Sequence, residues 1–445
     1  MTKVPANAQP EKRLFISLLT RDISLSAAVL DLIDNSINSS VILENLELRN
    51  PEDYLSLIRR EPTTKLPAIK IFLSEDEFTI EDQCGGISFA AARDEVFRFG
   101  RPPSDDEDTG DREDTLSVYG IGLKRALFKI GNSVNMTSTH PETGFTLDLD
   151  VRAWERKPQK EWSFDIEPRE GKLNGHYGTK ITIKELYPEI KSRIGDGKFR
   201  GDLVRNIART YSYYLERVVS VEVEDDLVEP VDLELGDNRA MTKFELGEVS
   251  CTIIAGIAIP RGKFYEGEAA GWYIFCNGRG VSFAEKTSLT GWGIYLPNYQ
   301  PKFRPFLGLV FFTSDLPELL PWTTTKASIN QESAVWQQAL RTMGVVGKQI
   351  TSVLDQQYST AGAEISREQL QDVAGPAVSA LQNVAASARP FRMPVIRKTT
   401  TRVCFDAEKS EIEEVKRHLG RRSVSNVAVG RMAFDHFLDN VVREE

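Results

Sequence analysis

Histidine and cysteine, the side chains that most often bind zinc or form disulfides, are scarce in this chain. Its 445 residues contain four of each, and neither type falls at the paired spacings of a zinc site or a disulfide framework. No apolar run approaches the roughly 20 residues that span a bilayer, and the first residues lack the apolar core of a signal peptide. The sequence therefore predicts a cytoplasmic protein with no disulfide scaffold, no zinc site and no membrane partner.

An excess of basic residues is also missing, because the net charge is −10. This balance argues against a body coated with phosphate-binding residues, although it leaves room for a local basic module. The chain is 41% hydrophobic and 27% charged, which is typical of a globular protein. Its length favours several domains, and we expect them at residues 13–225, 226–345, 346–388 and 389–445.

The stretch around which the chain is organised is residues 25–40, LSAAVLDLIDNSINSS. On a helix its apolar residues gather on one side, and Asp31, Asp34, Asn35 and Asn38 gather on the other. Asp31 and Asn35 are four apart in sequence, so they share a helix face. A carboxylate beside a carboxamide suits polarising a water molecule and holding hydrated Mg²⁺. The alternative is a solvated face built from cap-forming residues.

A carboxylate is expected at the lip of a sheet, at Asp82. Residues 68–73 and 77–82 have the pattern of two strands in a hairpin, and Gln83-Cys84-Gly85-Gly86 follows the second strand. Glycine at this point lets the backbone approach a ligand closely. A plain glycine turn is the alternative for this stretch taken alone.

An acidic, turn-rich loop at residues 101–116 precedes a second glycine motif. The loop cannot build a core, so we expect a lid or a surface insertion. Gly120-Ile121-Gly122-Leu123-Lys124 then opens an apolar helix. Amides at a helix N-terminus together with a lysine form an anion site suited to phosphate, although the spacing is not that of a P-loop.

The remaining pattern predicts an α+β fold, in which an antiparallel sheet and its helices form two layers. Strands are expected at 133–139, 145–151, 162–166, 179–185 and 218–225, with a helix at 198–216, and at 248–260, 271–283 and 303–314 in the second domain. A long helix is expected at 334–359. The chain is then expected to continue helically to residue 388, with a break near Gly375-Pro376.

Taken in order, these motifs resemble the GHKL ATPase superfamily, which includes gyrase, the heat-shock chaperone, histidine kinases and MutL. The resemblance covers residues 25–183 and implies a Bergerat fold, a two-layer α/β sandwich that binds ATP and Mg²⁺. It assigns Mg²⁺ to Asn35, the adenine amino group to Asp82 and the phosphates to the glycines and lysine after the lid. The implied nucleotide-binding residues are Asn35, Asp82, Gly86, Gly120, Ile121, Gly122, Leu123, Lys124 and Thr179.

This chain departs from the family pattern at the expected general base. Hydrolytic members carry glutamate four residues before the asparagine, whereas this chain has Asp31. Because aspartate is one methylene shorter, the attacking water must sit closer to the backbone, and hydrolysis is expected to be slow. Cys84 also replaces the first glycine after Asp82. Because the cysteine side chain is small, we expect the fold to tolerate this replacement.

The second domain extends the resemblance. Phe275-Cys276-Asn277-Gly278-Arg279 looks like the Asn-Gly-Arg strand of the MutL-type transducer, an S5-like domain. Thr324-Thr325-Lys326 looks like the loop that gyrase and MutL relatives send to the γ-phosphate, so Lys326 is the candidate sensor of ATP against ADP. MORC-type and other stand-alone members are nearest in layout.

The tail, residues 389–445, holds 12 Lys and Arg against nine Asp and Glu. A basic linker leads to a strand at 399–406 and helices at 410–420 and 424–441, an order that resembles a ribbon-helix-helix unit in which two chains pair their strands. The implied partners are a second copy of the chain and DNA or a protein client. A simple packing module is the alternative.

We therefore hypothesise a Mg·ATP-binding ATPase that acts as a nucleotide-driven homodimerisation switch, with an association to DNA in repair, chromosome organisation or phage defence. The alternative is a nucleotide-gated binding or chaperone-like module with negligible hydrolysis, which Asp31 in place of glutamate motivates.

Overall fold

The computed structural model describes residues 11–61, 65–100, 116, 120–260, 262, 265–361, 367–392, 406–419 and 424–442. The chain divides into two compact units, residues 1–394 and 395–445, and each is described by itself. The lid expected at 101–116 and the strand expected at 399–406 lie outside the described residues, apart from Leu116 and Asp406.

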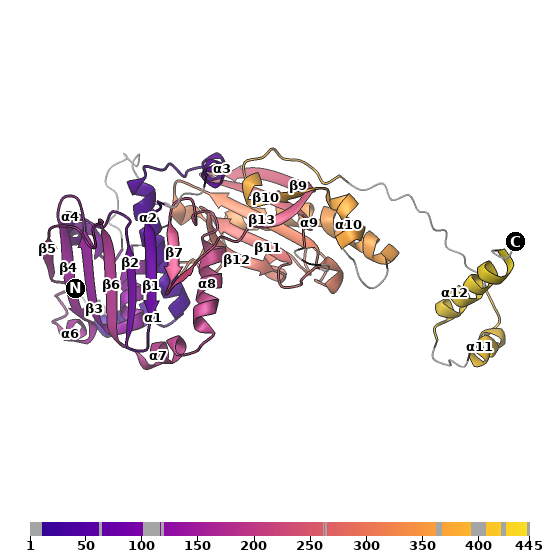
Figure 1. Ribbon diagram of the computed structural model, residues 1–445, viewed down its shortest axis with the longest axis horizontal. Helices are drawn as coiled ribbons and strands as arrows, with labels where there is room; N and C mark the ends of the chain where they lie inside the picture. Colours follow the sequence, from indigo (N-terminus) through magenta and orange to yellow (C-terminus); the bar gives the residue numbers. More distant parts are fainter. Residues whose placement is uncertain are drawn as a thin grey trace, which may run out of the picture. The chain divides into compact units, whose positions relative to one another are not determined.

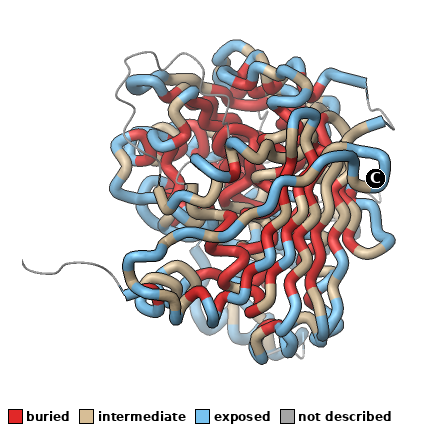
Figure 2. The backbone as a smooth tube through the Cα atoms, turned by 90° about the vertical axis from the view of Figure 1, so that its left-hand side faces the viewer, coloured by how far each residue is buried: buried red, intermediate tan, exposed pale blue. Residues whose placement is uncertain are grey.

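The first sheet has eight strands in the order β5-β4-β3-β6-β2-β1-β7-β8 (Figure 1). Neighbouring strands are antiparallel except for β1 and β7, which are parallel. The strands are β1 (Ala68–Leu73), β2 (Glu77–Asp82), β3 (Gly131–Thr139), β4 (Gly144–Asp150), β5 (Ile166–Arg169), β6 (Gly178–Leu186), β7 (Ser220–Val223) and β8 (Asp226–Leu227). Buried residues alternate with less buried ones along 145–150 and 179–184 (Figure 2), so one face of this sheet meets the core.

Two helices position the motifs on this sheet. Helix α5 (Gly122–Ile130) packs on β3 and β6, and α2 (Leu25–Leu43) packs on α5. Ser24 caps α2, because its Oγ accepts a hydrogen bond from the Ala27 amide at 3.1 Å. The other helices are α1 (Lys12–Thr20), α3 (Pro51–Arg59), α4 (Phe89–Ala91) with a π-helical turn at Ala92–Val96, α6 (Val151–Arg156), α7 (Pro188–Ile194) and α8 (Phe199–Thr210). The structure is thus α+β, as predicted.

The second sheet has six strands in the order β12-β11-β13-β10-β9-β14. They are β9 (Glu234–Leu246), β10 (Val249–Ala258), β11 (Gly271–Cys276), β12 (Arg279–Glu285), β13 (Phe306–Thr313) and β14 (Ala377–Ser379). Every residue of β11 and β13 is buried, so both faces of these strands are covered. Helix α9 (Ala334–Ala361) packs on β10, β9 and β13, and α10 (Arg367–Ala374) follows it.

The turn between β11 and β12 of the second sheet packs against the first domain. Asn277 and Gly278 have φ angles of 46° and 71°, which is the geometry of a tight hairpin turn. A Cβ on Gly278 would lie 2.6 Å from Tyr54 Cε1, and Tyr214 Oη donates to the Asn277 carbonyl oxygen at 2.5 Å. The single strand expected at 271–283 is therefore wrong, because the chain reverses here and buries the turn among tyrosines of the first domain.

Other sequence expectations also differ from the structure. Residues 377–379 form β14 rather than a helix, because Gly375 has a φ of 75° and ends α10 before Pro376. Strand β9 was not expected, since its burial does not alternate regularly. The strand expected at 162–166 begins only at Ile166.

The second unit contains α11 (Lys409–His418), α12 (Asn426–Phe437) and a π-helical turn at Leu438–Val442. Both helices expected in the tail are therefore present. Within its described part, Val429 is buried, whereas Val427 and Phe437 are exposed. Across the described ranges of the chain, no helix is both long enough and apolar enough to cross a membrane.

Candidate functional site

The polar face of α2 is buried rather than solvated. Asp31 and Asp34 expose only 2% and 1% of their surface. Helix α5 lies across this face, since a Cβ on Gly122 would sit 3.5 Å from the Asp31 side chain. Buried carboxylates need compensating cations, and these come from α5 and from the domain of the second sheet.

Asp31 forms an ion pair with Arg125 of α5. Its Oδ2 accepts from Arg125 Nε at 3.0 Å and from Nη2 at 2.5 Å, and both side chains are almost fully buried. Burial raises the pKa of Asp31, and the charges of Lys326 and Arg125 act against that rise. Asp31 Oδ1 accepts no hydrogen bond from the described residues, so it remains open to a water molecule or a ligand.

Asp34 connects α2 to the second sheet. Its Oδ1 accepts from Tyr211 Oη at 2.7 Å and from Arg279 Nε at 2.9 Å, and its Oδ2 accepts from Lys326 Nζ at 2.7 Å. Burial alone would raise the pKa of Asp34. The charges of Arg279 and Lys326 outweigh burial and hold that pKa below its usual value, so the carboxylate is ionised.

Asp82 ends β2 in a set of hydrogen bonds that ties it to α2. Its Oδ1 accepts from the amides of Cys84 at 2.9 Å and Thr179 at 3.2 Å, and its Oδ2 accepts from Ser36 Oγ at 2.9 Å. Burial raises the pKa of Asp82, and these hydrogen bonds offset part of the rise. A carboxylate offers about four lone-pair positions, so Asp82 keeps acceptor capacity for a donor on a ligand.

A cavity of about 310 Å³ opens beside the loop that follows Asp82, between Ser39 and Leu43 of α2 and the loop residues 83–86. Gly86 has a φ of +73°, and a Cβ there would lie 1.9 Å from the Thr139 carbonyl oxygen. Only glycine fits this close approach, so the second glycine of the motif is required by the neighbouring strand.

The glycine-lysine motif forms the start of α5. Gly120 has a φ of 62°, Ile121 is the cap residue, and the helix begins at Gly122. Lys124 is only 2% exposed, and its Nζ donates to the carbonyl oxygens of Val96, at 2.7 Å, and Gly120. Burial lowers the pKa of Lys124 to about 8. Its ammonium therefore makes its hydrogen bonds with main-chain oxygens rather than with α2.

Asn35 carries the feature that best fits a polar ligand. Its side chain makes no hydrogen bond with the described residues, and its buried Nδ2 has no partner. Such a group costs free energy unless a ligand satisfies it. No group of three or more His, Cys, Asp or Glu that could hold a metal occurs in the described ranges. The open Nδ2 donor fits an acceptor on a ligand, such as a phosphate oxygen, and the carboxamide oxygen of Asn35 would be the atom that holds a hydrated Mg²⁺ together with the phosphates.

Three residues of this region were missed by the sequence motifs. Arg125 directly follows the motif lysine, Arg279 ends the Asn-Gly-Arg motif, and Tyr211 follows α8. The only signal for the two arginines was their position, since Arg125 follows a recognised motif and Arg279 lies within one. Nothing in the local pattern indicated Tyr211.

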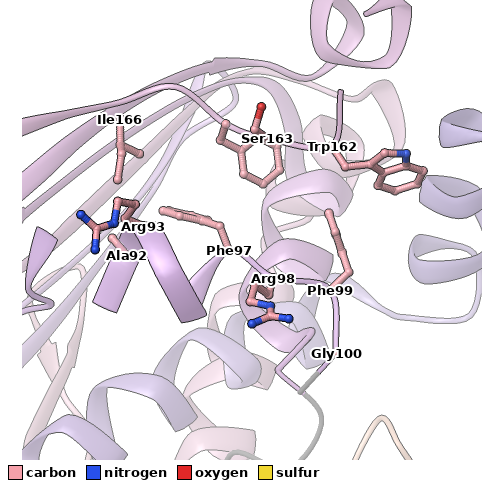
Figure 3. A pocket seen from close by; sticks show the side chains of 10 residues that line it. Ala92, Arg93, Phe97, Arg98, Phe99, Gly100, Trp162, Ser163 and Ile166 are labelled. Carbon is pink, nitrogen blue, oxygen red and sulfur yellow. The ribbon is translucent and has the colours of Figure 1, made fainter. Parts of the chain in front are cut away.

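A larger cavity, of about 610 Å³, lies beside β5 and the π-helical turn. Figure 3 shows Phe97, Phe99 and Trp162 around it, with Arg93 and Arg98 nearby. None of the residues that line it belongs to the motifs above. Size alone therefore does not identify the ligand site of this protein.

Comparison with known families agrees with the geometry. A family model described as histidine kinase-, DNA gyrase B-, and HSP90-like ATPase matches residues 23–173, which include α2, β2 and α5. No curated protein matches the chain. Residues 23–173 therefore form an ATP-binding domain of the GHKL type.

Proposed function

We propose that this protein binds Mg·ATP between α2, the end of β2 and the start of α5, and that the nucleotide controls dimerisation. The observation that carries the proposal is the unpartnered carboxamide of Asn35, which lies on α2 between Asp34 and Ser36. Through Asp34 the helix contacts Arg279 of the second sheet, and through Ser36 it contacts Asp82. One helix thus connects the expected base, metal and sensor positions.

The residues of the chain have distinct tasks in this proposal. Asp82 accepts from the adenine amino group, Thr179 supports the base, and the amides at the start of α5 receive phosphate oxygens. Asn35 holds Mg²⁺ through its side-chain oxygen. When bound, the ion would neutralise charge on the phosphates while the terminal phosphoryl group is transferred to water.

Hydrolysis depends on Asp31. Its Oδ1 remains open to accept a proton from water, but Arg125 engages the other oxygen and stabilises the carboxylate. Arg125 opposes the rise in the pKa of Asp31 that burial causes, and the side chain is one methylene shorter than glutamate, so slow turnover or none is expected. This pair favours the second candidate function, a nucleotide-gated binding module, and steady-state phosphate release separates the two.

The experiment that tests the switch is light scattering after size exclusion, with and without a non-hydrolysable ATP analogue and Mg²⁺. We expect a dimer in the presence of the analogue. A chain that ends at Pro394 lacks the second unit and so tests its contribution, since the exposed Val427 and Phe437 of that unit support a contact between copies. A mass that does not change with nucleotide in either chain contradicts the switch. Association with DNA, proposed from the local charge of the tail, requires salt-dependent binding that the shortened chain lacks.

The pH dependence of nucleotide binding provides a separate prediction. Because burial lowers the pKa of Lys124 to about 8, the ammonium is present at pH 7 and lost by pH 9. We expect nucleotide affinity to fall over that range, since phosphate attracts only the charged form. Bound phosphate raises the pKa of Lys124, so binding at pH 8 should take up about half a proton. Calorimetry in buffers of different ionisation enthalpy measures this uptake, and Lys124→Met should abolish it.

A further inference from the structure

Asp34 gathers three side chains although the family motif assigns it no role. Tyr211, Arg279 and Lys326 contact its carboxylate, and their exposed fractions are 0%, 2% and 7%. We call these four residues the Asp34 cluster. Its members come from α2, the end of α8, β12 and the loop before α9, so the cluster joins both sheets of the first unit.

The cluster fixes Lys326 at two points. Its Nζ donates to Asp34 Oδ2 at 2.7 Å, and its carbonyl oxygen accepts from Arg279 Nη1 at 2.8 Å. Arg279 Nε in turn donates to Asp34 Oδ1 at 2.9 Å, which closes a ring of three residues. Lys326 has a φ of 51°, a left-handed backbone conformation that residues other than glycine adopt uncommonly.

Hydrogen bonds and charges in the cluster are not balanced. An ammonium has three donors, and Lys326 uses one of them on Asp34 among the described residues. Two cations, Arg279 and Lys326, also face one carboxylate, while the neighbouring Asp31 is already paired with Arg125. The region therefore has an excess of positive charge and open donors, which an anion would satisfy.

We propose that Asp34 is a positioning residue that holds Lys326 in place before nucleotide binds. The open donors of the Lys326 ammonium then meet the terminal phosphate of ATP bound at Asn35. This inference rests on the proposed function. It also explains why a lysine of the second domain is buried against α2, since an anchored ammonium loses less entropy on binding phosphate than a mobile one.

The test compares affinity for Mg·ADP with affinity for Mg²⁺ and a non-hydrolysable ATP analogue. Asp34→Asn keeps the size of the side chain and removes its charge. We expect the analogue to bind roughly tenfold to hundredfold more weakly, the range for a hydrogen bond to a charged group, with Mg·ADP affinity unchanged. ADP lacks the phosphate that Lys326 contacts, so a merely structural role for Asp34 would weaken both ligands together.

A double-mutant cycle identifies Lys326 as the residue through which Asp34 acts. Lys326→Met leaves Asp34 paired with Arg279, so no buried charge is left unpaired. We expect Asp34→Asn combined with Lys326→Met to bind the analogue as weakly as Lys326→Met alone, because the two changes remove one interaction. Losses that add contradict the proposal.

Asp34→Glu serves if Asp34→Asn does not fold, since it keeps the charge and displaces Lys326 by one methylene. The same selective loss of analogue affinity is expected. An unchanged preference for the analogue over ADP in a folded variant overturns the inference. If the unaltered protein binds neither ligand, the proposed function fails first, and if it binds both equally, only the role of Lys326 and Asp34 fails.

Discussion

Asn35→Ala is expected to lose Mg·ATP binding by roughly a hundredfold or more while the protein stays folded. The side chain of Asn35 makes no hydrogen bond with the described residues, so its removal breaks none of their hydrogen bonds. The change in the free energy of unfolding should stay within about 1 kcal/mol. The same removal takes away the one protein oxygen proposed for Mg²⁺, and the phosphates then lose their link to α2.

Asn38→Ala is the matched control on the same helix. Asn38 is 4% exposed, and its Oδ1 accepts from the Leu116 amide at 3.1 Å. Its removal should lower stability by about 1–3 kcal/mol, because it leaves a buried amide unpaired, with a smaller effect on nucleotide affinity. Calorimetric titration with Mg·ATP and thermal unfolding of both variants measure the contrast. An Asn35→Ala protein that binds with unchanged affinity removes Asn35 from the site.

The sequence predicted the parts of the site that depend on local spacing. Asn35 lies on a helix whose face could be drawn from residues 25–40, and Asp82 ends a strand that glycine follows. Helical and strand periods repeat over a few residues, so each motif could be located without knowledge of the rest of the fold.

The partners of the two α2 carboxylates could not be found in this way. Arg125 lies 94 residues from Asp31, and Lys326 lies 292 residues from Asp34. No local period connects such positions. The local pattern of α2 therefore could not show that its polar face is buried against other parts of the fold. From the sequence, Asp31 could be compared with the usual glutamate only by the length of its side chain. Its chemistry is determined by its burial beside the guanidinium of Arg125.

The turn at Asn277-Gly278 was missed for a related reason. An Asn-Gly pair between apolar runs is a strong hairpin signal, but the surrounding residues were interpreted as one strand of a known domain type. The same glycine is required by the tyrosines of the other domain, since a Cβ there would lie 2.6 Å from Tyr54. Sequence patterns describe the segment and not the surface on which it packs.

Arg125→Met is expected to lower the free energy of unfolding by about 3–5 kcal/mol, because it leaves Asp31 as an unpaired charge in the interior. The loss should depend on pH. Burial already raises the pKa of Asp31 above its usual value, and the variant loses a charge that opposes the rise. The folded state then holds its proton more tightly than the unfolded state, so stability falls as pH rises above the ordinary aspartate range.

Two further variants make this prediction specific. Arg205→Met removes the arginine of an exposed pair with Asp202, which should cost no more than about 1 kcal/mol. Asp31→Asn combined with Arg125→Met removes both charges, so it should recover most of the lost stability and its unfolding should no longer depend on pH through this site. Asp31→Asn alone should keep nucleotide binding and remove any phosphate release. Chemical denaturation measures the stability of each variant, and a phosphate assay on the same samples measures its turnover. If Arg125→Met is as stable as Arg205→Met at pH 8, the pair does not hold Asp31 in its charged form, and Arg125 does not explain slow turnover.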